Sequence, residues 1–185
     1  MPILPSGLTA NAIASAVLVV GWLCVLRWAR HWGWGIALLT LIGTIAHELL
    51  HAVVGWAVFA RPTSFSIIPR RQKDCWVLGS VGFRNLNIWN AAPAAFAPVL
   101  LAWGAWLVFG HWMQPAFQHG HYLSWTGAGY VTAVALFSSV PSHIDIRMGA
   151  ASALMYGCIG GLIVLAIYSS SSTFALGLLS ASPTR

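Results

Sequence analysis

The sequence predicts an all-α membrane protein, a bundle of about five transmembrane helices with a β-hairpin between the second and third spans. Three observations support this fold class. Only 6% of the 185 residues are charged and 58% are hydrophobic, whereas a soluble domain carries roughly 25% charged residues. Several apolar runs reach the roughly 20 residues that cross a bilayer as a helix. Between two of these runs lies a polar stretch whose apolar residues alternate with a period of two, as in strands.

The five expected spans form a single domain over residues 1–185, and they cover about residues 8–26, 34–59, 89–109, 124–140 and 149–168. The first run has no basic segment before it and no clear cleavage site, so we expect a retained span rather than a signal peptide. The residues from 110 to 123 are expected to form a loop. The tail from Ser169 onward is expected to be a loose or interfacial terminus.

The longest polar stretch, residues 61–87, is predicted to be a β-hairpin. Two β-like runs, Thr63–Ile68 and Cys75–Phe83, flank a charged turn at Pro69–Asp74. Apolar and small polar side chains alternate along both runs, which favours two half-buried strands over a helix.

The basic residues between the apolar runs predict the orientation. Six of them lie in the hairpin or in the loop after the fourth span: Arg61, Arg70, Arg71, Lys73, Arg84 and Arg147. Two, Arg27 and Arg30, follow the first span on the other side. The excess of basic residues predicts that the hairpin and the N-terminus are cytosolic, in the inner cell membrane. The net charge of +6 comes from basic residues in loops between apolar runs, where they act as topology signals. A nucleic-acid partner is therefore not expected. The expected partners are the lipid bilayer and a membrane-anchored protein.

Inside the second predicted span, His47-Glu48-Leu49-Leu50-His51 forms an HExxH motif. Helix positions four residues apart share a face, so both imidazoles can bind one tetrahedral Zn²⁺ while Glu48 reaches a water molecule. A shuffled chain of this composition would contain HExxH only about once per thousand sequences. The alternative, two core histidines and a neutral glutamate, leaves three costly polar groups unexplained in one turn. We therefore expect one zinc ion per chain, with Glu48 as catalytic base.

A catalytic zinc usually has three protein ligands, and the composition restricts the third. Glu48 is the only glutamate, and the longer HExxHxxGxxH pattern is not continued after His51. Asp145, at the end of the fourth predicted span, is the expected third ligand, and His143 is the alternative. The competing explanation for Asp145 is an ion pair with Arg147.

These features together resemble the site-2 protease family of intramembrane zinc metalloproteases. The resemblance covers roughly residues 38–147 and rests on HExxH in a span, the hairpin after it, and an Asp motif at the end of a later span. Within Ser138–Ile146, Pro141 and Asp145 match the family's NxxPxxxLDG-type motif, whereas serine and isoleucine stand at its Asn and Gly positions.

The resemblance implies a short family member without a PDZ domain that hydrolyses peptide bonds in or near transmembrane segments of membrane-anchored proteins. The hairpin edge would hold the extended substrate by β-strand addition, with Gly79 and Gly82 permitting close backbone approach. Asn87 and Asn90 are candidate contacts to the substrate or oxyanion. Hairpin flexibility is the alternative for the glycines, and capping of the third span is the alternative for the asparagines.

Two other functions are weighed against the protease. Asn90–Ala97 resembles the family's AGPLANL-type segment but has Phe96 at the Asn position, and such departures motivate a metal-binding pseudoprotease that regulates without cleaving. A zinc or proton transporter would use His47, Glu48 and Asp145 as a relay. Three further histidines are expected to be solvated in the loop after the third span: His111, His119 and His121.

Overall fold

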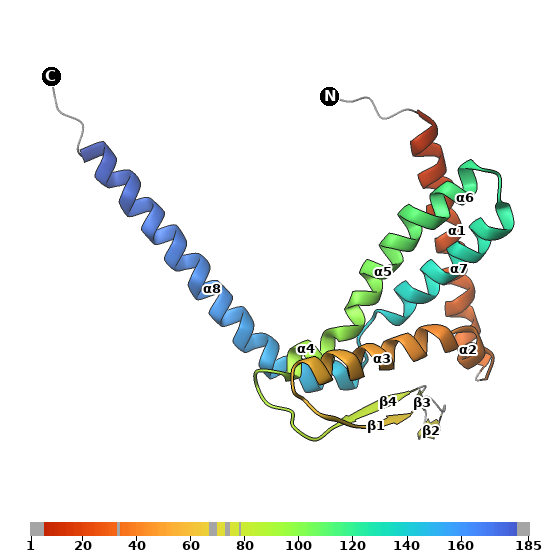
Figure 1. Cartoon of the computed structure of the whole chain (residues 1–185), viewed down its shortest axis with the longest axis horizontal. Helices are drawn as coiled ribbons and strands as arrows, with labels where there is room; N and C mark the ends of the chain where they lie inside the picture. Colours follow the sequence, from red (N-terminus) through yellow and green to blue (C-terminus); the bar gives the residue numbers. More distant parts are fainter. Residues whose placement is uncertain (1–5, 33, 67–69, 73–74, 78, 181–185) are drawn as a thin grey trace.

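The structure is a computed structural model that describes residues 6–32, 34–66, 70–72, 75–77 and 79–180. Helices make up most of it, and a small hairpin lies at one end (Figure 1). The helices are α1 (Ser6–Ala29), α2 (Trp34–Leu39), α3 (Leu41–Ala57), α4 (Ala91–Phe96), α5 (Leu100–Val108), α6 (Gln114–Gln118), α7 (Tyr122–Ser138) and α8 (His143–Ser180). Short turns join several of them: the 3₁₀ turns η1 (Arg30–Trp32) and η2 (Ala97–Val99), and the π-helical turn η3 (Phe109–Met113).

Within the described residues, three helical segments are long and apolar enough to cross a bilayer: Ala10–Ala29, Ala91–Gln118 and His143–Ser169. They correspond to the first, third and fifth predicted spans, so the prediction of a helical membrane protein is confirmed at this level. The middle segment runs from α4 to α6 through η2 and η3 and is about 42 Å long at 1.5 Å per residue. A helix of that length exceeds the roughly 30 Å hydrocarbon layer and must tilt within it.

Two helices are longer than predicted. The expected loop over 110–123 is helical as far as Gln118. The π-helical turn η3 ends just before Pro115 and accommodates the hydrogen bond that proline cannot donate, so the helix continues. At the C-terminal end, α8 extends past Ser169 to Ser180. Ser169 Oγ donates to Ala166 O at 2.9 Å, a bond typical of serine within a helix. Polar residues thus continue this helix rather than ending it.

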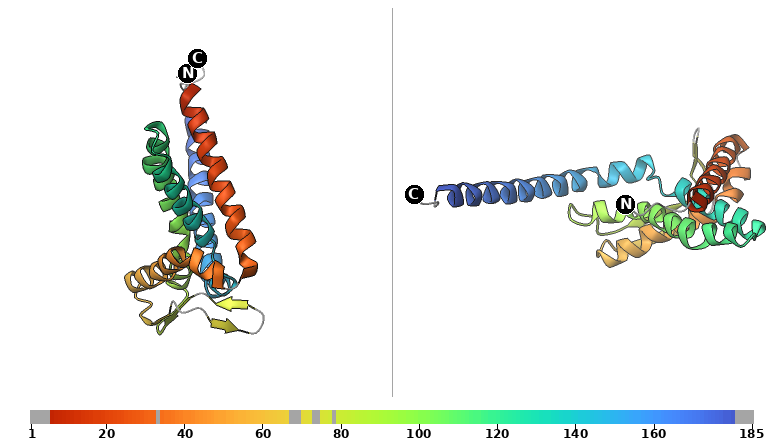
Figure 2. Two further views of the ribbon diagram at one scale, coloured as in Figure 1. Left: turned by 90° about the vertical axis from the view of Figure 1, so that its right-hand side faces the viewer. Right: turned by 90° about the horizontal axis from the view of Figure 1, so that it is seen from above.

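The second predicted span is broken and short. The helix is interrupted at Thr40, whose Oγ1 donates to Ile36 O at 2.8 Å, and α3 then runs for 17 residues. That is about 25 Å, less than the hydrocarbon thickness. Figures 1 and 2 show α3 lying across one end of the molecule rather than alongside α1. The five-span bundle is therefore not confirmed.

The placement of α3 also changes which ends of the helices lie together. Figure 1 shows α1 beginning at the end of the molecule opposite the hairpin, and α8 ends on that same far side. The prediction that the N-terminus and the hairpin lie on the same side of the membrane stays a prediction, and Figure 1 shows only that they lie at opposite ends of the molecule. The last turn of α1, which contains Arg27, lies towards the hairpin end, next to α2 (Figure 1).

The predicted hairpin is present as two short antiparallel ladders. They pair β1 (Pro62–Ser66) with β4 (Ser80–Phe83), and β2 (Arg70–Gln72) with β3 (Cys75–Val77). Ser66 lies opposite Ser80, and Gln72 lies opposite Cys75. The predicted turn over Pro69–Asp74 was too long, since Arg70–Gln72 forms a strand. Pro69 and residues 73–74 lie outside the described residues.

The helices pack through small side chains. The buried set is dominated by alanine and other small residues, such as Ala94, Ala128 and Ser152, whereas large apolar side chains such as Leu123 and Trp103 are exposed. Lipid tails are as apolar as leucine, so membrane helices associate by close packing rather than by burying large apolar groups. A Cβ on Gly43 would come within 2.6 Å of Val134 Cγ1, and one on Gly149 within 2.8 Å of Ala95 Cβ. These two close approaches bring α7 to α3 and α8 to α4.

Candidate metal centre

The face of α3 that packs against its neighbours carries the predicted ligands. Gly43, His47, His51 and Gly55 follow one another at four-residue intervals, which places them along one side of the helix. His51 is 4% exposed and Glu48 is 7% exposed. Leu49, on the opposite side of the helix, is 51% exposed. The polar side of α3 is thus the buried one, and its imidazoles and carboxylate need polar partners.

Asp145, in the first turn of α8, supplies such a partner. Its carboxylate lies between the rings, with Oδ2 3.6 Å from His47 Nε2 and Oδ1 3.3 Å from His51 Nε2. The two Nε2 atoms are 3.2 Å apart. A tetrahedral ion with bonds of about 2.1 Å holds its ligand atoms about 3.4 Å from one another. Three residues far apart in sequence are thus spaced as one metal ion requires, and their ligand atoms lie within 4.8 Å of each other.

The other nitrogen of each ring determines which atoms face the site. His47 Nδ1 lies 2.6 Å from Ser138 O, and His51 Nδ1 lies 2.7 Å from Ala94 O. A carbonyl oxygen only accepts hydrogen bonds, so both Nδ1 atoms donate and carry the proton. In the neutral rings the two Nε2 lone pairs then face one another and the Asp145 carboxylate. A cation stabilises that arrangement, and a carbonyl on the opposite nitrogen is usual for metal-binding histidines.

Glu48 lies beside this cluster and beneath the hairpin. Its carboxylate is close enough to His47, His51 and Asp145 to interact electrostatically with all three. A Cβ added to Gly79 would come within 2.6 Å of Glu48 Cγ and 2.7 Å of its Oε1. A side chain at Gly79 would displace the Glu48 side chain, so the Gly79 backbone lies directly beside the Glu48 carboxylate where the chain enters β4.

The remaining predicted contact residues have partners within the chain. Asn90 is 4% exposed; its amide donates to Asn85 O at 2.9 Å, and its Oδ1 accepts from Asn87 N at 2.8 Å. Asn87 Oδ1 in turn accepts from Trp89 N at 2.9 Å. These bonds order the turn before α4, although Asn90, which precedes the helix, makes no side-chain capping bond to it. Gly82 lies opposite Ser64 in the β1–β4 ladder, and a Cβ on it would displace the Ser64 hydroxyl.

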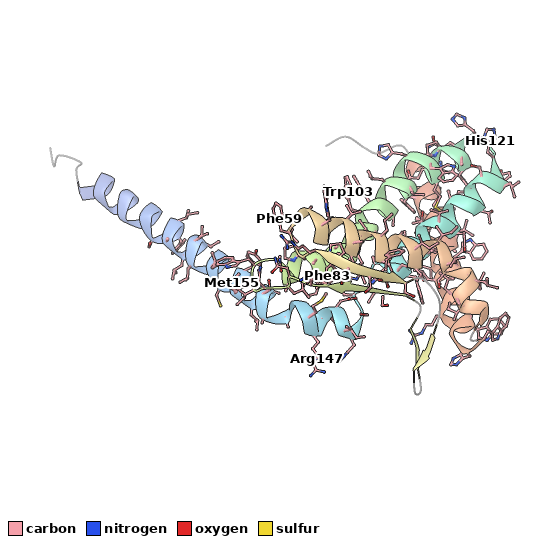
Figure 3. The ribbon with its side chains drawn as sticks, turned by 60° about the horizontal axis from the view of Figure 1, so that its bottom comes forward. Phe59, Phe83, Trp103, His121, Arg147 and Met155 are labelled. Carbon is pink, nitrogen blue, oxygen red and sulfur yellow. The ribbon has the colours of Figure 1, made fainter. Side chains whose placement is uncertain are left out.

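The alternative candidates lie elsewhere. His143 is exposed at the start of α8 and is not among the three clustered ligands. Arg147 points away from the helix bundle (Figure 3). Asp145 is 7% exposed, and its carboxylate faces the histidines. His121 lies at the other end of the molecule from Arg147 in the same view. His119 and His121 have ring centroids 6.2 Å apart there.

Sequence reasoning missed the groups that support the ligands. The carbonyls of Ser138 and Ala94 carry no side-chain signal, although both residues lie in the stretches that resemble family motifs. Gly43 and Gly149 had a weak signal, because each lies in an apolar helical run at a multiple of four residues from a ligand, His47 or Asp145. Small residues at such spacing are typical of close helix contacts in membranes.

The chain was also compared with known proteins. No protein-family model matches it, and neither a curated protein nor a solved structure shows significant similarity.

Proposed function

We propose that this chain is an intramembrane zinc metalloendopeptidase of the site-2 protease type, which cleaves membrane-anchored proteins in or near their transmembrane segments. The observation that carries the proposal is the convergence of His47, His51 and Asp145 at spacings suited to one metal ion, with Glu48 beside them. Two nitrogens and one carboxylate oxygen are a ligand set that suits zinc and leaves a position for water or substrate.

The catalytic roles follow from the positions of the side chains. Bound zinc supplies Lewis-acid polarisation of a carbonyl group and activation of a water molecule. Glu48 accepts the proton of the attacking water and passes it to the leaving amine. His47 and His51 stay in one tautomer, because their Nδ1 protons are donated to Ser138 O and Ala94 O. Burial of the cluster keeps bulk water away from these charges, which strengthens their interactions with the substrate.

The hairpin supports the proposal that the substrate is a membrane-anchored protein. A helical peptide has no free carbonyl or amide to present, so the segment to be cut must be extended. In a two-stranded sheet each strand has one unpaired edge, and an extended peptide can pair with it by strand addition. The Gly79 backbone beside Glu48 leads directly into β4, so a strand bound along β4 would reach the catalytic carboxylate. Asn87 and Asn90 remain candidate contacts through the turn that they order.

The distribution of basic residues supports an orientation with the metal centre towards the cytosol, in the inner cell membrane. Arg27 lies in the last turn of α1, Arg61 and Arg84 flank the β1–β4 ladder, and Arg147 lies in the first turns of α8. From the sequence, six basic residues were expected on one side of the membrane and two on the other. In this proposal all of them lie at one end of the molecule, and the positive-inside rule then favours a cytosolic position for that end. In this proposal α3 and α7 are also embedded in the membrane, and α3 does not cross it.

One observation favours a metal-binding pseudoprotease as the second candidate. Phe96 stands where the family motif has an asparagine, and its ring lies in the α4–α8 contact, with Cε2 2.8 Å from where a Cβ of Gly149 would be. An aromatic ring there donates no hydrogen bond to a peptide. A protein that kept the metal but lost such polar contacts would bind membrane partners without cleaving them.

The deciding experiment compares the wild type with Glu48→Gln in detergent or nanodiscs. We expect about one zinc per chain in both, because Glu48 is not a ligand, and a fall in cleavage of membrane-anchored peptides of at least about 100-fold in the variant. Zinc content is measured by elemental analysis and cleavage by mass spectrometry. Zinc in both proteins without Glu48-dependent cleavage would favour the pseudoprotease. A wild type that binds no zinc would refute both candidates.

A further inference from the structure

The residue before α8, Ser142, is bonded to Asp145 in both directions. Asp145 N donates to Ser142 Oγ at 3.2 Å, and Ser142 N donates to Asp145 Oδ2 at 2.7 Å. Because α8 begins at His143, Asp145 occupies the third position of the helix. A serine before a helix and an acidic residue at its third position, each bonded to the backbone of the other, form a capping box.

The carboxylate held by this capping box is the one that faces the histidines. Its Oδ2 accepts from Ser142 N and lies 3.6 Å from His47 Nε2, while its Oδ1 lies 3.3 Å from His51 Nε2. A free aspartate loses rotamer freedom when it binds a metal, and this loss weakens binding. The capping box imposes the restriction before a metal arrives, so less freedom remains to be lost.

The connection between α7 and α8 supports two of the three ligands. Ser138 O, at its start, accepts from His47 Nδ1, and Ser142, at its end, holds Asp145. Ser139, between them, directs its hydroxyl to Leu136 O at 2.8 Å, back towards α7. Two serine hydroxyls in the same short connection therefore have different roles, one directed at a ligand and one at the preceding helix.

We propose that Ser142 is a positioning residue whose hydroxyl holds the first turn of α8 so that Asp145 is presented to the metal. The inference rests on the proposed function, since it assigns Ser142 to the same metal centre. Ser142 does not bind the metal itself. Its effect passes through Asp145 and is therefore a change in metal affinity and not a change in the chemistry of the loaded site.

The test compares Ser142→Ala, Ser142→Thr and the matched control Ser139→Ala with the wild type. Each protein is stripped with a chelator and titrated with zinc against a chromophoric competitor. We expect Ser142→Ala to bind zinc about tenfold more weakly, and Ser142→Thr, which keeps a capping hydroxyl, to stay within about twofold of the wild type. Ser139→Ala should leave zinc affinity unchanged. Cleavage by Ser142→Ala should return to the wild-type rate when zinc is raised about tenfold further.

The outcomes separate this inference from the proposed function. The inference is wrong if the wild type binds zinc and Ser142→Ala binds it equally tightly. A lower melting temperature of the metal-free Ser142→Ala protein would then show that Ser142 is only a helix cap. If Ser142→Ala lowers affinity and Ser142→Thr restores it, the inference is supported. A wild type without zinc affinity would overturn the metal centre and this role together.

Discussion

At the scale of single residues, the metal centre depends on where protons reside. Ser138 O and Ala94 O hold the protons of His47 and His51 on the Nδ1 side, so the Nε2 atoms are left as lone-pair donors. Asp145 then has two roles, because its carboxylate closes the capping box and also faces both rings. A helix cap alone would not require the two Nε2 atoms to be 3.2 Å apart.

These positions predict that Asp145 and not His143 is the third ligand. Asp145→Asn removes the charge while preserving the shape of the side chain, and we expect zinc affinity to fall by at least about 100-fold. His143→Ala should change affinity by less than about twofold, since His143 is exposed at the start of α8. Competitive zinc titration of both purified variants measures this. Equal affinity in Asp145→Asn and the wild type would contradict the assignment.

At the scale of helices, the ligands are brought together by close approaches that only glycine allows. Gly43 stands one turn before His47 on α3, and a Cβ there would meet Ser138 Oγ and come within 2.6 Å of Val134 Cγ1. The same residue, Ser138, provides the carbonyl that holds the His47 proton. The approach of α7 to α3 is thus coupled to the orientation of a ligand.

We therefore predict that Gly43→Ala affects both stability and metal binding. Overpacking a tight contact typically costs about 1–3 kcal/mol, and the displaced Ser138 carbonyl should weaken zinc binding by about tenfold or more. The matched control is Gly127→Ala on α7, where a Cβ would meet no atom within 4 Å. Thermal unfolding and zinc titration are measured on both. Unchanged zinc affinity in a correctly folded Gly43→Ala protein would show that the contact between α3 and α7 does not influence metal binding, and would contradict the prediction.

The helices also show which features the sequence contains and which it does not. HExxH specifies one helix face, because helical spacing alone brings His47 and His51 together. Asp145 could be predicted as a ligand by elimination, since the sequence has few acidic residues. The interruption at Thr40 could not be predicted from hydropathy, because hydropathy does not show the hydrogen bond from the threonine side chain to Ile36 O. The continuation of the third span past Pro115 likewise depends on a local π-helical turn.

At the scale of the whole molecule, α2 and α3 lie along the end that carries the hairpin, and this placement bears on the proposed membrane topology (Figure 1). If the second apolar run crossed the membrane, α1 would begin on the same side as the hairpin. In the structure α3 lies across one end of the molecule and α1 begins at the opposite end, so the last turn of α1 and η1, which carry Arg27 and Arg30, lie towards the hairpin end (Figures 1 and 2). This arrangement removes the one conflict in the charge pattern, since no basic residue of the described helices is then left at the far end of α1.

This topology is testable with single cysteines in a variant whose native cysteines are serine. We expect Ser6→Cys, at the start of α1, to react with a membrane-impermeant maleimide added outside intact spheroplasts. Ser64→Cys, in β1, should react only after lysis, because the basic end that contains the hairpin is held in the cytosol. A five-span chain would instead protect both positions in intact cells. Labelling of Ser64→Cys from outside would reverse the orientation, and the metal centre at the hairpin end would then open away from the cytosol.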